Sequence, residues 1–319
     1  MNYFVEPGNE ASYRQAVARL TKYARLKLGL SLLELSKKTG VSRSELTKIE
    51  KQSKTVSASG WIALCDVLKI PGDSLKYGYI DRLTDKFEVF GSGFDLPSEY
   101  VIGANICIRD ILPLFRYIEA IDQLDFDHLF SKILGIDPFY MLTVDHKVNH
   151  HFVSKLLFAI KSIMGRANED HDEFVYDLVS FSENQMKDKF LHGRLSDQYD
   201  SCSSKEELLK SYIQNRFKYE SLYDYNIKSA HIDTLIVEIK PSQYLQNNYD
   251  VMDMPFKLYM YDRIEKNIRG MGRYLISDKR IYQLKELQNL IKYSFDETFS
   301  FEVTIKPDLH LMGSGSVIQ

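Results

Sequence analysis

Residues 29–50 read GLSLLELSKKTGVSRSELTKIE, and this stretch decides the fold of the N-terminal quarter of the chain. Ser31 and Glu34 form a capping box: the serine hydroxyl accepts from an early amide of the helix, and the glutamate bonds back to the serine amide. The same pair recurs at Ser42 and Glu45. A glycine between the two boxes suits the left-handed conformation that ends many helices. The sequence therefore predicts two short capped helices joined by a tight turn.

Further amphipathic segments flank this pair. Tyr13–Leu28 places apolar residues on one helical face, and Gly29 ends it. Between Trp61 and Leu68, apolar residues recur at i, i+3, i+4 and i+7, which is the spacing of an amphipathic helix. Leu75 can pack a short fifth helix after the Pro71-Gly72-Asp73 stop. Two capped helices with a short connection, set among three others, are a helix-turn-helix pattern.

Charge is divided unevenly along the chain. Residues 11–80 hold 13 lysine and arginine residues against 5 aspartate and glutamate residues, a net charge of +8. The whole chain carries −3, and residues 81–319 carry −9. A basic segment attached to a larger acidic one indicates that only the first meets a polyanion.

Residues 29–50 resemble the Cro/phage-repressor (XRE) helix-turn-helix family. Gly40 of the turn, the Val41-Ser42-Arg43-Ser44 entry and the Ile49-Glu50 pair carry the resemblance. It implies a sequence-specific regulator that binds double-stranded operator DNA, with a homodimer as the default because paired reading heads span adjacent DNA turns. Leu32 departs from the pattern, since the family usually has glutamine there. We expect one DNA contact to be lost and an apolar group to be exposed at that position.

The second capped helix is the candidate reading element. Val41, Leu46 and Ile49 would anchor it on the core, which leaves its other face outward. Arg43 near its start can bind a guanine in bidentate fashion. Residues just beyond it, and the amides that open the preceding helix, suit phosphate contacts. The candidate DNA-binding residues are Ser31, Ser42, Arg43, Ser44, Thr47, Lys48, Lys51, Gln52 and Lys54.

The fold class expected is a mainly α, five-helix N-terminal domain, residues 11–78, plus a larger α+β C-terminal domain, residues 82–311. Within the latter, 108–182 suits a helical subdomain and 203–308 an α/β subdomain. Helices are predicted around 111–118, 125–134, 152–160, 174–181, 205–217 and 280–293. Strands are predicted around 86–90, 100–106, 234–239 and 300–305, where β-branched and aromatic residues gather.

The C-terminal part is less explicit about function. Residues 111–160 are weakly similar to the sensor segment of AraC-type regulators, which implies an effector-sensing and dimerising domain. The aromatic run including Tyr212, Phe217 and Tyr223 is a candidate lining for a small-molecule or peptide effector, although such runs are more often core. Dimerisation without an effector is equally compatible with the pattern. An alternative is an interaction protein, antitoxin-like or antirepressor-like, whose C-terminal part binds another protein.

Catalytic and metal signals are weak. His146, His150 and His151 lack an obvious third ligand for a metal. Asp125, flanked by Asp122 and Asp127, is better explained as a helix cap than as part of a calcium loop. Gly91-Ser92-Gly93 lacks the third glycine of a dinucleotide fingerprint. We therefore expect no enzyme activity, cofactor or metal. Without a signal peptide or an apolar run of about 18 residues, we also expect a cytoplasmic protein with reduced thiols.

Overall fold

The computed structural model describes residues 10–82, 96–121, 124–180, 189–203, 205–231, 234–260, 262–264, 291–295 and 301–305. The chain begins with the helices α1 (Glu10–Lys27), α2 (Leu32–Thr39), α3 (Arg43–Glu50), α4 (Ala58–Leu68) and the 3-10 turn η1 (Gly72–Lys76). They enclose an apolar core in which Leu20, Leu35, Leu46, Ile49 and Leu64 are fully buried. The five predicted helices are thus present.

The later residues, 96–305 as far as the structure describes them, are called the body. It opens with α5 (Ser98–Val101), η2 (Ile108–Ile111), α6 (Leu112–Ala120), α7 (Phe126–His128), the π-helical η3 (Leu129–Ile133) and η4 (Pro138–Leu142). It continues with α8 (His150–Ile163), α9 (His171–Ser180), α10 (Lys189–His192), α11 (Leu195–Asp200) and α12 (Lys205–Tyr219). A short antiparallel ladder joins β1 (Ile106–Cys107) to β2 (Lys147–Val148).

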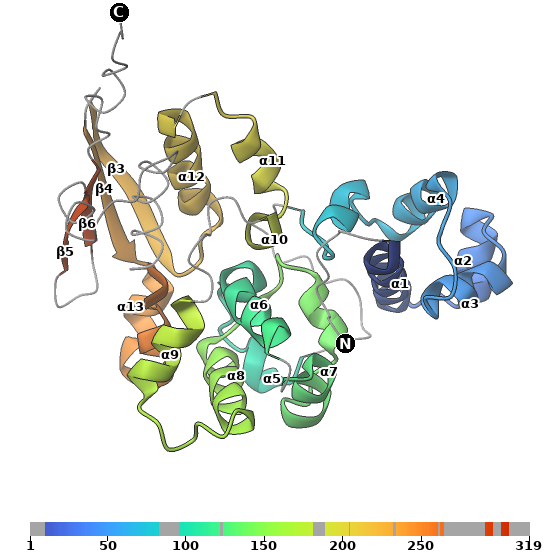
Figure 1. The fold of residues 1–319 in the computed structure, drawn as a ribbon, viewed down its shortest axis with the longest axis horizontal. Coiled ribbons are helices and arrows are strands. Elements are labelled where there is room, and N and C mark those ends of the chain that lie inside the picture. Colours follow the sequence, from blue (N-terminus) through green and yellow to red (C-terminus); the bar gives the residue numbers. More distant parts are fainter. Residues whose placement is uncertain are drawn as a thin grey trace, which may run out of the picture.

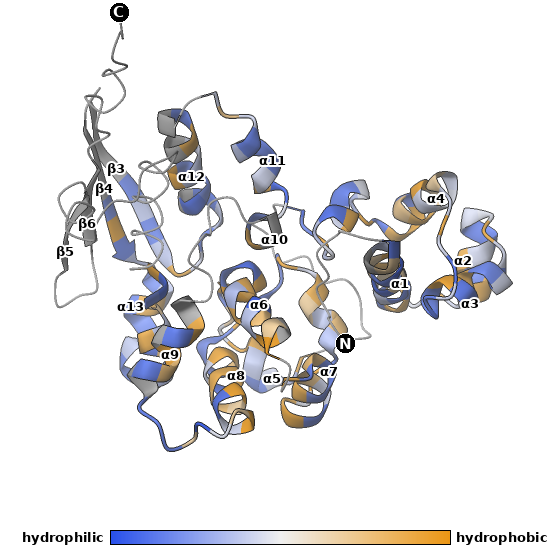
Figure 2. Ribbon diagram, in the orientation of Figure 1, coloured by the Kyte–Doolittle hydropathy of each residue, from blue (hydrophilic) through white to orange (hydrophobic). Residues whose placement is uncertain are grey.

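The body also contains a four-stranded antiparallel sheet. Its strands are β3 (Tyr223–His231), β4 (Thr234–Pro241), β5 (Ile291–Phe295) and β6 (Phe301–Ile305), in the order β3-β4-β6-β5. After β4 come α13 (Gln243–Asn248), η6 (Tyr249–Val251) and helical residues 254–260 and 262–264. The body is therefore α+β, and the predicted fold class is confirmed. Figure 2 shows α4 and α8 as largely hydrophobic.

Most of the predicted body elements are found, and two are wrong. Residues 98–101 are helical, so the strand expected over 100–106 is limited to its end in β1. The helix expected over 280–293 ends in a strand, because residues 291–295 (IKYSF) alternate with period two and pair with β6. Residues 280–290 and the strand expected over 86–90 lie outside the described part.

The N-terminal helices are held directly against the body. Tyr23 of α1 shares a hydrogen bond of 2.7 Å with Thr143, through the tyrosine and threonine hydroxyls. Ile80, beyond η1, forms a parallel bridge with the same threonine. Figure 1 shows α2 and α3 at the end of the molecule that lies furthest from strands β3–β6. The predicted reading helix is thus presented away from the body.

Candidate nucleic-acid interface

Capping interactions fix the start of each helix in the turn motif. At α2 the Glu34 amide donates to Ser31 Oγ at 3.2 Å, and the Ser31 amide donates to Glu34 Oε2 at 2.8 Å, which completes the predicted capping box. Gly40 ends α2 with a φ of +73°, a conformation that favours glycine. The Glu45 amide donates to Ser42 Oγ at 3.2 Å and starts α3. The turn therefore has the geometry that the sequence predicts.

Only one of the two hydrogen bonds of the second capping box forms, the one from the Glu45 amide to Ser42 Oγ. The Glu45 carboxylate accepts from Lys54 Nζ at 2.7 Å, so its side chain braces the segment that follows α3. The prediction of a reciprocal bond to the Ser42 amide is wrong in this respect, because the lysine ammonium is the stronger partner for the carboxylate. Lys54 keeps half of its side chain exposed.

One face of α3 is buried and the other is open. Leu46 and Ile49 are fully buried, and Val41 before the helix is nearly so. On the opposite side the predicted readers Arg43, Ser44 and Lys48 are exposed, and Thr47 is half-buried. The Thr47 hydroxyl donates back to the Arg43 carbonyl at 2.9 Å, so a bond within the helix holds this side chain.

A buried ion pair sets the position of α3. Arg25 at the end of α1 makes two hydrogen bonds to the Glu50 carboxylate, of 2.7 and 2.9 Å, and a third to the Leu30 carbonyl at 2.9 Å. Both charged side chains are about 10% exposed. Such a planar, bidentate pair has one geometry, so it fixes the end of α3 relative to α1. The sequence does not indicate this pair, although the Ile49-Glu50 motif places a carboxylate there.

The end of α3 turns sharply through Gln52. Its φ of +59° is left-handed, and the Ser53 amide reaches back to the Lys48 carbonyl at 2.9 Å. This arrangement is a helix-terminating turn that favours glycine at the left-handed position. Lys51 and Lys54 are exposed on either side of it, and Gln52 is half-buried. The candidate phosphate-contacting residues therefore form one short surface segment after the reading helix.

Leu32, at the start of α2, is the residue that departs from the family pattern, and its side chain does not lie where the sequence predicts. Leu32 is half-buried and packs against the core, whereas the neighbouring Leu33 has half of its side chain exposed. The expectation of an exposed apolar group at Leu32 is wrong, because the helix turns that side chain inward. The glutamine usually found there is still absent, so the expected loss of its DNA contact stays a prediction.

Part of the positive charge of the N-terminal segment faces the body rather than solvent. Lys22 lies over the Phe139 ring at 5.3 Å, and Lys27 over the Tyr140 ring at 5.1 Å. Lys76 donates to Asp197 at 2.9 Å. These cations serve internal contacts. The excess available to a polyanion comes from the side of α2, α3 and the turn after α3.

Residues 22–75 match the family model described as Helix-turn-helix. This segment is a helix-turn-helix DNA-binding domain. The predicted recognition is confirmed for the segment, and the family is one of non-enzymatic DNA-binding domains. No curated protein and no solved structure matches the chain. The similarity of residues 111–160 to AraC-type sensors stays a prediction.

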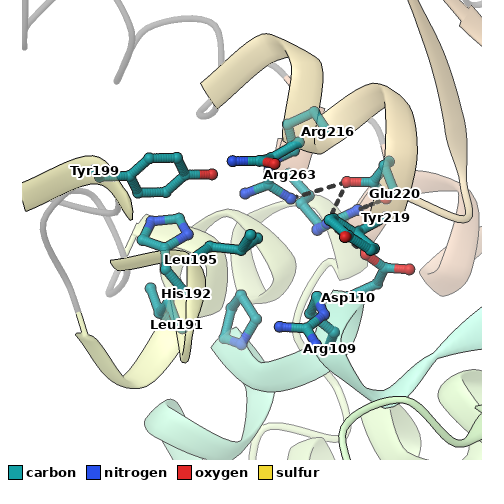
Figure 3. A pocket seen from close by; sticks show the side chains of 12 residues that line it. Arg109, Asp110, Leu191, His192, Leu195, Tyr199, Arg216, Tyr219, Glu220 and Arg263 are labelled. Atoms are coloured by element: carbon teal, nitrogen blue, oxygen red, sulfur yellow. Dashed lines mark hydrogen bonds and ion pairs between the residues drawn. The ribbon is translucent and has the colours of Figure 1, made fainter. Parts of the chain in front are cut away.

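The body behind the helix-turn-helix domain holds a cluster of buried charges (Figure 3). Arg263 donates to Glu220 at 2.8 and 2.9 Å and to Asp110 at 3.2 Å, while Arg216 donates to Glu220 at 2.9 Å. Burial and the Glu220 charge raise the pKa of Asp110 to about 7. Burial alone would raise the pKa of Glu220, but Arg263 and Arg216 outweigh it and hold that pKa at about 2.

Two cavities border this cluster. The inner cavity of about 30 Å³ lies between α10, α11 and α12 and has room for one or a few waters. The outer cavity of about 360 Å³ lies beside β1, β2, β3 and α13. Tyr212 and Tyr223 are almost fully buried and line neither of these two cavities. The side chain of Phe217 lies outside the described part, and the ligand role of the three residues stays a prediction.

The weaker metal hypotheses receive no geometric support. His146 packs against the Tyr140 ring, whereas His150 Nδ1 shares a 3.0 Å hydrogen bond with the Tyr244 hydroxyl. Asp125 accepts from two amides at the start of α7, as a helix cap does. In the described ranges no three His, Cys, Asp or Glu side chains are grouped as metal ligands would be. Asp122 and residues 91–93 lie outside those ranges.

Proposed function

We propose that the protein is a sequence-specific transcriptional regulator that binds operator DNA as a homodimer, with the body responding to an effector or partner. The observation that carries the proposal is the open face of α3, where Arg43, Ser44 and Lys48 are exposed over a helix anchored by buried Leu46 and Ile49. A helix of this kind enters the major groove with its first residues toward the base edges.

The proposed contacts fall into two groups. Arg43, Ser44, Thr47 and Lys48 read bases from α3. The other candidates position the domain on the backbone: the cap residues Ser31 and Ser42, with Lys51, Gln52 and Lys54 after the reading helix. The division into a DNA-binding unit over 11–78 and a regulatory unit over 82–311 belongs to the same proposal. So do its cytoplasmic location beside the DNA and the absence of enzyme activity.

No helix in the described ranges is long and apolar enough to cross a membrane. The described part of each chain presents one reading helix, α3, and operators with two half-sites need two such helices about one DNA turn apart, which supports a homodimer.

The test is selection of duplexes from a random pool by the full chain, followed by titration of the selected duplex at several salt concentrations. We expect the logarithm of affinity to fall linearly with the logarithm of salt concentration, because phosphate contacts release counterions. Lys51→Ala should lower the slope by about 1. Lys76→Ala is the matched control: Lys76 pairs with Asp197 of the body, so the slope should not change. Failure to select any sequence would refute specific DNA binding.

A further inference from the structure

The outer cavity has the size of a small-molecule site but no excess of either charge. Its volume is about 360 Å³, and its walls come from four segments of the chain, residues 105–109, 145–147, 218–224 and 242–244. Three basic side chains and three carboxylates are on these walls, and the described lining contains no aliphatic side chain. This balance favours neither a simple anion nor a simple cation, and the polar lining disfavours an apolar ligand.

Four of the six charged groups on the walls are compensated by the protein itself. Arg109 is shared between Asp81 and Asp145, at 2.6 and 2.9 Å. Glu220 is held by two arginines of the body. The Lys218 ammonium lies over a tyrosine ring of the same wall, 4.8 Å from its centre. These groups shape the cavity, but their charges are not available to a ligand.

The other two charges, on Lys147 and Asp224, have opposite signs. Among the described residues Lys147 Nζ makes one hydrogen bond, a long one of 3.4 Å to the amide oxygen of Asn105, so it has N–H groups left to donate. In the same part of the chain the side chain of Asp224 makes no hydrogen bond or ion pair. The two groups therefore line one cavity without pairing with each other.

We propose that the outer cavity binds a free α-amino acid as its zwitterion, one with a polar or aromatic side chain. Lys147 donates to the carboxylate of the ligand, and the ammonium of the ligand donates to Asp224. A zwitterion supplies both partners without changing the net charge of the cavity. Asn105, Gln243 and Tyr244 line other parts of the wall, and their amide and phenol groups suit a polar or aromatic side chain better than an aliphatic one.

The same walls hold the segment that follows the helix-turn-helix domain. Arg109 makes two hydrogen bonds to Asp81, of 2.6 and 3.0 Å, and Asp145 accepts from the Arg82 amide at 2.8 Å. An amino acid in the cavity thus lies beside two side chains whose other contacts hold the DNA-binding domain, and its presence changes DNA affinity through them. This regulatory half rests on the proposed function. Binding in the cavity does not, because it is measured without DNA.

The experiment is calorimetric titration of the full chain with each of the common L-amino acids. We expect at least one with a polar or aromatic side chain to bind with a Kd below about 1 mM. Its amide, which lacks the carboxylate, and its N-acetyl derivative, which lacks the ammonium, should each bind about tenfold more weakly or worse. Binding by leucine alone, absence of binding by every amino acid, or equal binding by either blocked form overturns the proposal.

Two variants test the role of each charge. Lys147→Met should weaken binding of the amino acid about tenfold or more without weakening binding of its amide, which has no carboxylate to hold. Asp224→Asn should weaken binding of the amino acid without weakening binding of the N-acetyl derivative. Lys132→Met and Asp250→Asn remove exposed charges outside the cavity and should leave the affinity unchanged. Parental affinity in either cavity variant overturns the contact assigned to that residue.

The second arm measures the affinity for the selected duplex with and without the bound amino acid. We expect a change of about fivefold or more, lost in Lys147→Met and kept in Lys132→Met. Amino-acid binding with unchanged DNA affinity overturns the regulatory half. If the chain selects no duplex at all, the proposed function fails, while calorimetry still decides whether the cavity binds an amino acid.

Discussion

Gly193, between α10 and α11, lies against the carboxylate that joins the helix-turn-helix domain to the body. The adjacent Arg194 amide donates to Asp81 Oδ2 at 2.9 Å. A Cβ atom at Gly193 would lie 2.2 Å from that same oxygen and 2.9 Å from the Tyr79 hydroxyl. Real Cβ atoms do not approach so closely, so Gly193→Ala must displace either the Asp81 carboxylate or the backbone beside it, and we expect the bond from the Arg194 amide to Asp81 to be lost.

The expected loss in the free energy of unfolding for Gly193→Ala has two parts. Gly193 has a φ of +54°, and an alanine in this left-handed region costs about 1–2 kcal/mol. Loss of a hydrogen bond to a charged group costs about 1.5–3 kcal/mol. Gly165→Ala is the matched control, because its φ is +70° and nothing lies within 4 Å of its Cβ position. The control should therefore lose only the first part, about 1–2 kcal/mol.

The assay follows the fluorescence of the chain's single tryptophan during urea unfolding. Trp61 lies in α4, is 9% exposed and donates to the Gly72 carbonyl at 3.3 Å, so it reports on the helix-turn-helix domain. We expect Gly193→Ala to lower the free energy of unfolding from this signal by about 1.5–3 kcal/mol more than Gly165→Ala does. Equal losses in the two variants would show that the contact at Asp81 does not stabilise the domain.

Three further outcomes are expected. Arg43→Ala should relax the preference at one base position, costing about 1–3 kcal/mol of discrimination, as measured by repeating the duplex selection. Gln52→Gly should raise the free energy of urea unfolding by about 1 kcal/mol, because glycine adopts the left-handed φ of +59° without strain. Burial, with the charges of Lys27 and Arg82, lowers the pKa of His146 to about 3. The neutral histidine therefore contributes stability above its ordinary pKa of 6.5, and this is lost at about 1.4 kcal/mol for each pH unit as pH falls from 6.5 toward 3. His146→Gln should show a smaller loss when unfolding is measured across that range.

Each of these has an outcome that contradicts it. Arg43 is not a base reader if the variant selects the same sequences as the parent. Destabilisation by Gln52→Gly would mean that contacts of the glutamine side chain outweigh the relief of strain. Parallel stability curves for His146→Gln and the parent protein between pH 6.5 and 4 would mean that this histidine is not held neutral.

Local chemistry explains why the N-terminal helices could be predicted in detail. A serine three residues before a glutamate accepts hydrogen bonds from amides of its own helix, and Gly40 ends a helix without any distant partner. Both features therefore depend only on residues that are close in the sequence. The ion pair of Arg25 with Glu50 joins positions 25 residues apart, and the Asp81–Arg109 pair joins two units of the fold. No sequence pattern specifies such partners before the tertiary structure brings them together.

The same difference appears in the body. Helix α8 can be predicted because apolar residues recur at helical spacing from Phe152 to Ile160. Strand β3 was not predicted: its tyrosines at 223 and 225 were interpreted as part of an aromatic run, and pairing with β4 determines its conformation. The sequence does not indicate the outer cavity either, because its walls come from four separate segments of the chain.

Helix α1 contacts both the reading helix, through Arg25 and Glu50, and the body, through Tyr23 and Thr143. A single rigid element therefore connects the DNA-facing surface to the rest of the protein. If two copies were joined through their bodies, the contact between the bodies would set the separation of the two reading helices. One inserted base pair moves a half-site by about 3.4 Å and turns it by about 34°. Tolerance for operators of altered spacing should accordingly be narrow.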